Sequence, residues 1–158
     1  DKIIPSLSDG IAKLDSRVDT LVIAGMGGNL IKDILMSNSD NLKNVKNVII
    51  DAHTDMQEVY KALASLSFEL KDSKFITDNG KPYEVMLWEK VKDPVFYTKK
   101  EMKYGFFNLK NHNEDWKNYY LKKIDKNHKI INELPKGNEK IQIIEDEIKE
   151  IEEVLKGF

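Results

Sequence analysis

Residues 21–31 constrain the fold more than any other part of this sequence. They read Leu-Val-Ile-Ala-Gly-Met-Gly-Gly-Asn-Leu-Ile, an apolar segment that ends in a glycine-rich turn and leads directly into a helical pattern. In parallel α/β sheets this arrangement brings backbone close to a small ligand at the carboxyl end of a strand. Gly25, Gly27 and Gly28 permit positive φ angles and a close approach of the ligand to the main chain. The same turn is also compatible with a tight connection that binds nothing.

Alternating strand and helix patterns follow this turn. We predict buried strands at 20–24 and 45–52 and amphipathic helices at 29–37 and 55–65. Two further strands, at 68–77 and 83–92, flank Asp78-Asn79-Gly80, which is a hairpin signal. The predicted fold class is therefore α/β, with a sheet that ends in an antiparallel pair.

The character of the chain changes after residue 94. Residues 97–132 contain nine lysines and four acidic residues, and aromatic residues lie between the lysines. Positions on both sides of a turn at 135–138, all apolar except Asn127, follow the a/d spacing of a coiled coil. These positions are Tyr120, Ile124, Asn127, Ile131 and Leu134, then Ile141, Ile144, Ile148, Ile151 and Leu155. We expect an α/β domain at 1–94 and an antiparallel helical hairpin within 95–158.

Composition excludes several classes of protein. The 158 residues include no cysteine, so a disulfide framework or thiolate metal site is ruled out, and His112 and His128 lack metal-ligand spacing. No apolar stretch approaches the ~20 residues that span a bilayer. The net charge of −2 argues against a generally basic nucleic-acid binder. We expect a cytoplasmic protein without metal or membrane association.

The order of short motifs resembles one enzyme family. Ser8-Asp9-Gly10-Ile11 precedes Asp19-Thr20 and the hexapeptide Ile-Ala-Gly-Met-Gly-Gly at 23–28, and Gly80-Lys81-Pro82-Tyr83-Glu84 follows later. This order is similar to that of the bacterial tRNA (adenine-22-N1)-methyltransferases over residues 5–134. The resemblance implies the second half of a Rossmann-like methyltransferase sheet, S-adenosylmethionine as cofactor, tRNA as partner and a monomeric complete protein.

The resemblance also implies that a segment is missing. In a methyltransferase of this fold, two earlier strands carry the glycine-rich cofactor loop and the acidic residue that holds the ribose, and no segment here supplies either. We expect the N-terminal part of the catalytic domain to be absent from this sequence. The strand at 20–24 would then be left with an exposed apolar edge.

The family pattern assigns roles around the glycine turn. Asp9 would accept a hydrogen bond from the adenine amine of the cofactor, although it could instead cap a short helix at 10–14. Met26 would flank the cofactor or be a core residue. Gly27 and Gly28 would face the target base. The full set of expected cofactor-binding residues is Ser8, Asp9, Gly10, Ala24, Gly25 and Met26.

Asp51-Ala52-His53 departs from the family pattern, which shows Gln-Pro-Asn after the second strand. We expect Asp51 and His53 to belong to the catalytic site together with Gly27 and Gly28. Asp51 could accept from the adenine N6 amine or stabilise the cationic product, and His53 could stack on or hydrogen-bond the base. Adenine N1 has a free lone pair, so methyl transfer to it requires positioning rather than a general base.

The lysine-rich region allows two interpretations. It can contact the tRNA backbone through Lys99, Lys100, Lys103, Lys117, Lys122 and Lys123. Alternatively, the lysines pair with the acidic second helix of the hairpin and are merely solvated. Two other functions also remain open: a non-catalytic RNA- or partner-binding module, and a phosphate-binding enzyme. The latter lacks both the Gly-x-Gly-x-x-Gly spacing and a Walker lysine.

Overall fold

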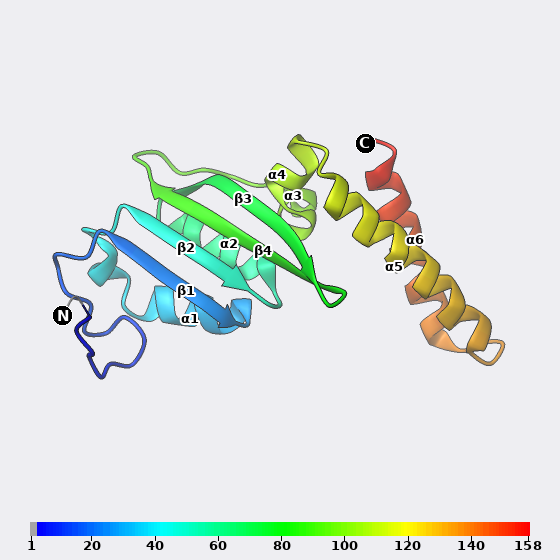
Figure 1. Ribbon diagram of the computed structural model, residues 1–158, viewed down its shortest axis with the longest axis horizontal. Helices are drawn as coiled ribbons and strands as arrows, with labels where there is room; N and C mark the ends of the chain where they lie inside the picture. The colour runs from blue at the N-terminus through cyan, green and yellow to red at the C-terminus, as the bar shows by residue number, and fades with distance from the viewer. Residues whose placement is uncertain (1–2) are drawn as a thin grey trace. The chain divides into compact units, whose positions relative to one another are not determined.

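The computed structural model describes residues 3–158, which group into two compact units (Figure 1). The first comprises residues 3–74 and Tyr83–Phe106, and the second comprises Phe75–Pro82 and Phe107–Phe158. The domain boundary at residue 94 stays a prediction. The elements are β1 (Thr20–Met26), α1 (Gly28–Ser37), the 3-10 helix η1 (Ser39–Leu42), β2 (Asn47–Ala52), α2 (Met56–Ser65), β3 (Phe68–Asp78), β4 (Lys81–Lys90), α3 (Lys99–Tyr104), α4 (Phe106–Lys110), α5 (Glu114–Glu133) and α6 (Glu139–Leu155).

The four strands form one sheet in the order β1-β2-β4-β3. β1 is parallel to β2, with Ala24 opposite Asp51, and β2 is antiparallel to β4, with Asp51 opposite Val85. Asn79 and Gly80 connect β3 to β4. Their φ angles of 48° and 75° are both positive, as the two central residues of a type I′ hairpin turn require. A parallel pair followed by a hairpin confirms the predicted α/β fold class.

The core of the first unit lies between the sheet and two helices. Alternate residues of β2, namely Val48, Ile50 and Ala52, are buried. Figure 1 shows α1 and α2 on one face of the sheet. Their buried residues recur at helical spacing and are Ile31 and Leu35 in α1 and Val59, Tyr60, Ala62 and Leu63 in α2.

β1 forms one edge of the sheet in the described residues. The prediction that the strand at 20–24 is buried is wrong, because β1 has a neighbouring strand on one side alone within residues 3–158. Val22 in its middle is 61% exposed, and Ile23 is the one buried residue of the strand. The exposed apolar edge expected for the strand at 20–24 is therefore present in the part of the chain that the structure describes. Hydrophobic side chains at an unpaired edge favour association with further polypeptide.

An aromatic cluster holds the segment after β4 against α2. The Tyr60 ring lies edge-to-face against Trp88 and Tyr97, with centroids 5.1 and 5.0 Å away. The Tyr60 hydroxyl accepts a hydrogen bond from the N–H of Phe106 (3.0 Å), and the Tyr97 hydroxyl accepts one from the N–H of Leu70 (2.8 Å). Burial raises the pKa of Tyr60 well above its ordinary range.

In the second unit, α5 and α6 form a helical hairpin. Ile124, Ile148 and Ile151, which the coiled-coil spacing places at the seam, are buried. Asn127 is buried as well, and its side-chain amide donates to Glu147 Oε2 (3.0 Å), while Lys123 Nζ lies 2.5 Å from Glu147 Oε1. The seam thus combines apolar packing with one polar cluster, which satisfies the buried amide.

Short helical segments differ from the predictions. The prediction of a short helix at 10–14 is wrong. Residues 10–13 form turns, and Gly10 has a φ of 52°, which lies outside the right-handed helical region. Conversely, α3 and α4 have no counterpart among the predicted elements. Thr98 and Glu101 cap α3: the side chain of each accepts a hydrogen bond from the backbone N–H of the other.

Candidate active site

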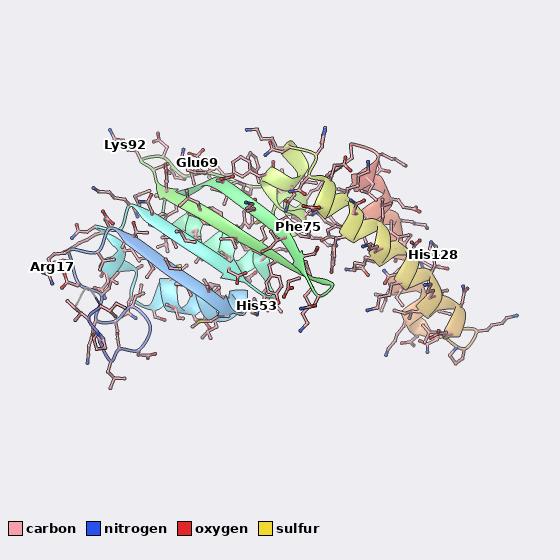
Figure 2. The ribbon with its side chains drawn as sticks, in the orientation of Figure 1. Arg17, His53, Glu69, Phe75, Lys92 and His128 are labelled. Atoms are coloured by element: carbon pink, nitrogen blue, oxygen red, sulfur yellow. The ribbon has the colours of Figure 1, made fainter. Side chains whose placement is uncertain are left out.

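Two backbone hydrogen bonds join the turn after β1 to the turn after β2. The N–H of His53 donates to the Met26 carbonyl (2.9 Å), and the N–H of Gly28 donates to the Thr54 carbonyl (2.8 Å). Because β1 and β2 are parallel, their carboxyl ends lie at the same end of the sheet, where Figure 2 shows His53. The structure thereby brings together the predicted site segments 25–28 and 51–53.

The three glycines of the first turn meet different surroundings. A Cβ at Gly28 would lie 2.3 Å from the Asp55 carbonyl oxygen, and one at Gly27 would lie 3.0 Å from Thr54 Oγ1. Gly25 has a φ of 77°, and no atom of the described residues lies within 4 Å of the position of a Cβ. Gly27 and Gly28 therefore allow the two turns to pack together, whereas Gly25 exposes backbone to open space.

Asp51, His53 and Tyr83 form a polar and aromatic cluster beside these turns. Oδ2 of Asp51 lies 3.6 Å from Nε2 of His53. The His53 and Tyr83 rings meet edge-to-face at 5.6 Å and 82°. Oδ1 of Asp51 is buried and, among the residues that the structure describes, has no hydrogen-bond partner. The cluster therefore combines an unsatisfied acceptor with a half-exposed imidazole.

The strand residues expected to bind the cofactor line the open side of this site. Ala24 and Gly25 are exposed, and Met26 is 38% exposed, which does not fit the core interpretation of its side chain. Together these residues offer an accessible strip of backbone and small or flexible side chains at the end of β1.

The Ser8–Gly10 loop is held elsewhere, by α1 and η1. A Cβ at Gly10 would lie 3.0 Å from Ile34 Cγ2, and the Asn41 amide donates to the Ile11 carbonyl (3.0 Å). The hydroxyl of Ser8 accepts from the N–H of Lys13 (3.0 Å), while Asp9 is exposed. The loop borders a hollow of about 630 Å³ whose lining includes Ser8, Gly10, Lys13, Asp15 and Arg17.

The six lysines expected to bind substrate fall into both units. Lys99, Lys100 and Lys103 lie on the exposed side of α3 in the first unit. Lys117, Lys122 and Lys123 lie on α5 in the second. Lys117 is 3.8 Å from Glu114 and Lys123 is paired with Glu147, so pairing within the hairpin accounts for two of the six.

Sequence reasoning does not assign Tyr83 or Thr54 to the site. The contact of Tyr83 with His53 depends on the register of β4 against β2. Thr54 follows His53 directly, and the polar run Asp-Ala-His-Thr-Asp at the end of a buried strand is the signal that could have found it.

Metal clusters and membrane-spanning helices do not occur in the described part of the chain. Residues 3–158 contain no group of three or more His, Cys, Asp and Glu side chains placed to hold a metal ion. None of the helices within the same residues combines the length and apolarity needed to cross a membrane.

A sheet with parallel strands, crossover helices and a glycine-rich turn at a carboxyl end defines a Rossmann-like α/β protein. The particular family is given by the sequence. The chain belongs to the tRNA (adenine(22)-N(1))-methyltransferase family, TrmK, whose model matches residues 1–153.

Known proteins similar to this chain are longer than it is. The tRNA (adenine(22)-N(1))-methyltransferase of Bacillus subtilis (strain 168) is 32% identical over 73 residues, which cover 46% of this chain and 31% of that protein. A Rossmann-superfamily protein from Streptococcus agalactiae is 31% identical with a TM-score of 0.79, covering 95% of this chain and 66% of that one. An uncharacterised Listeria monocytogenes protein is 27% identical with a TM-score of 0.80, over 94% of this chain and 68% of its own.

Proposed function

We propose that this chain forms part of an S-adenosylmethionine-dependent enzyme that methylates N1 of adenine 22 in tRNA. The observation that carries the proposal is the family match over residues 1–153, in a chain whose glycine turn and Asp51–His53 segment meet at one end of the sheet. A proposed tRNA (m1A22) methyltransferase from Streptococcus pneumoniae, 25% identical to this chain, has a structure in complex with S-adenosyl-L-methionine.

The residues at the end of β1 fit such a cofactor. Gly25 leaves open space where a side chain would stand, and Ala24 and Met26 are exposed beside it. We infer that these three residues hold the cofactor. Ser8, Asp9 and Gly10, which lie on the separate loop beside the hollow near Arg17, stay predicted cofactor contacts. When bound, S-adenosylmethionine supplies a methyl group carried on a positively charged sulfur.

The chain's own residues then have to hold and orient the base. The N1 lone pair of adenine is free, so no side chain has to remove a proton to create the nucleophile. The methylated base is cationic, and the carboxylate of Asp51 stands at the end of β2 where it can stabilise that charge. Gly27 and Gly28 keep this carboxylate and His53 close to the end of β1 by letting the two turns pack.

A methyl-transfer assay on unmodified tRNA tests the proposal. The complete protein is incubated with S-adenosylmethionine bearing a labelled methyl group, and the labelled nucleoside is identified and mapped. We expect N1-methyladenine at position 22 and no label in a matched tRNA that carries guanine there. Binding of tRNA without methyl transfer would contradict the proposal and favour a non-catalytic RNA-binding module.

A further inference from the structure

The Asp51 carboxylate is the least satisfied polar group of the site. Oδ1 is buried without a hydrogen-bond partner in the described residues, and Oδ2 lies 3.6 Å from His53 Nε2, which is longer than a hydrogen bond. A carboxylate accepts several hydrogen bonds, and a buried acceptor that is left unpaired is destabilising. Oδ1 is enclosed, but the side chain as a whole is 20% exposed, so a ligand can supply the missing donor at Oδ2.

His53 stands beside this acceptor and remains accessible. Its side chain is 46% exposed, against 20% for Asp51, and its backbone is fixed by the hydrogen bond to the Met26 carbonyl. An imidazole N–H is a donor. Asp51 and His53 together thus present an acceptor and a donor side by side at the carboxyl end of β2.

Adenine offers the complementary pair on one edge. Its N6 amine donates and its N7 accepts, and a single Asn or Gln side chain can read both at once. N1 lies on the other side of the amine, so recognition through N6 and N7 leaves N1 free for reaction. An enzyme that acts on N1 gains from holding the base by this edge, because enzymes that act on an extruded base read it by hydrogen bonds.

We propose that Asp51 and His53 recognise the target adenine through its N6–N7 edge, with Asp51 accepting from the N6 amine and His53 donating to N7. The inference rests on the proposed function and states which two residues make the enzyme select adenine. No other base presents this combination: guanine has an acceptor at the position of the amine, and hypoxanthine, which carries an oxygen there as well, is likewise refused.

Tyr83 acts as a positioning residue for His53. Asp51 lies opposite Val85 in the antiparallel pair of β2 and β4, so the same register continued by two residues places His53 opposite Tyr83. The two rings meet edge-to-face at 82°. This contact limits rotation of the half-exposed imidazole and keeps its N–H beside the Asp51 carboxylate.

The test uses tRNA with a single replaced base at position 22. Purine lacks the N6 amine, 7-deazaadenine lacks N7, and both retain N1. With the complete protein we expect kcat/KM for each analogue to fall about tenfold or more relative to adenine, as when one good hydrogen bond to a base is removed. Equal rates for adenine and 7-deazaadenine in the wild-type protein would overturn the inference without any variant.

Variants then assign each hydrogen bond to its residue. His53→Ala should abolish the fall in kcat/KM for 7-deazaadenine and retain the fall for purine. Asp51→Ala should retain the fall for 7-deazaadenine and reduce the fall for purine to the part that its less nucleophilic N1 causes. His53→Asn, whose amide can donate, should restore part of the discrimination. Tyr83→Phe should keep both falls, whereas Tyr83→Ala should reduce the one for 7-deazaadenine. His128→Ala, on the exposed side of α5, is the control and should change neither ratio.

The outcomes separate the inference from the proposed function. Methylation of adenine 22 without discrimination between the three bases, or discrimination that persists undiminished in both alanine variants, overturns the inference and leaves the proposed function intact. Failure of the wild-type protein to methylate tRNA with adenine at position 22 overturns both.

Discussion

At the residue scale, two adjacent glycines in the turn after β1 differ in what they tolerate. A Cβ at Gly28 would lie 2.3 and 2.6 Å from the carbonyl oxygens of Asp55 and Thr54, which are backbone atoms that cannot move independently. Among residues 3–158, a Cβ at Gly27 would lie within 4 Å of the Thr54 hydroxyl alone, which is 3.0 Å away at the end of a side chain. The spacing between the two turns is therefore set at Gly28.

We predict that Gly28→Ala lowers the free energy of unfolding by about 2–3 kcal/mol, because the added methyl group forces the two turns apart. Helix propensity alone predicts the opposite sign, since alanine is favoured over glycine by ~1 kcal/mol. Urea unfolding of the complete protein measures the change. Gly27→Ala is the matched control, with an expected cost below about 1 kcal/mol. Equal stability of the two variants would refute the packing role of Gly28.

Individual residues of the site differ in how far the sequence could predict them. Asp51 and His53 follow an apolar strand directly, so their place at a carboxyl end could be read from the pattern. The contact of Tyr83 with His53 could not, because it depends on the register of two strands 30 residues apart, which no local pattern specifies. The three glycines could be located, but their separate packing environments depend on the turn at residues 54–55.

At the scale of elements, a buried tyrosine ties α2 to the segment that leads into α4. Tyr60 has no exposed surface, and its hydroxyl oxygen accepts from the N–H of Phe106. Burial and, to a smaller extent, the nearby Glu84 raise its pKa above the ordinary value of about 10. The folded state therefore retains the Tyr60 proton at a pH where the unfolded chain has lost it.

This difference predicts a loss of stability in alkali. Below about pH 10 both states are protonated and Tyr60 makes no pH-dependent contribution. As the pH rises further, the unfolded state binds fewer protons than the folded state, so the free energy of unfolding falls. Urea unfolding between pH 9 and pH 11 should show this slope, and Tyr60→Phe should flatten it at a cost of about 1 kcal/mol at neutral pH. Tyr97→Phe should have a smaller effect in the same direction, and an unchanged slope in Tyr60→Phe would refute the assignment.

Long periodic elements could be predicted from the sequence, and short ones could not. β1, β2, α1 and α2 lie within two residues of their predicted bounds, because each segment follows a strand or helix pattern of apolar residues that can be read locally. α3 and α4 are six and five residues long, too short for a periodic pattern to appear. They are set by local caps and by tertiary contacts such as the hydrogen bond of Phe106 to Tyr60.

At the scale of the whole molecule, the net charge of −2 conceals a strong asymmetry between two helices of the second unit. α6 carries seven acidic residues and two lysines, whereas α5 carries four acidic residues and five lysines. Lys122, Lys126 and Lys129 are exposed and lie on one side of α5, at spacings of four and three residues. Within residues 3–158 none of the ion pairs that we observe involves these three lysines, so their charge is available to an anionic partner.

If tRNA binds to this side of α5, its phosphates displace counterions there, and affinity should fall linearly with the logarithm of salt concentration. We predict that replacing Lys122, Lys126 and Lys129 by Gln weakens tRNA binding and reduces the magnitude of the salt slope by up to about 3, or ~1 for each phosphate that the variant no longer neutralises. The measurement is a binding titration of the complete protein at several salt concentrations. The matched control replaces Lys140 and Lys149 on the acidic α6 by Gln and should leave the slope unchanged, because phosphates are repelled from that helix. An equal weakening in both variants would show a nonspecific charge effect, and an unchanged slope in the triple variant would exclude α5 as the RNA-binding surface.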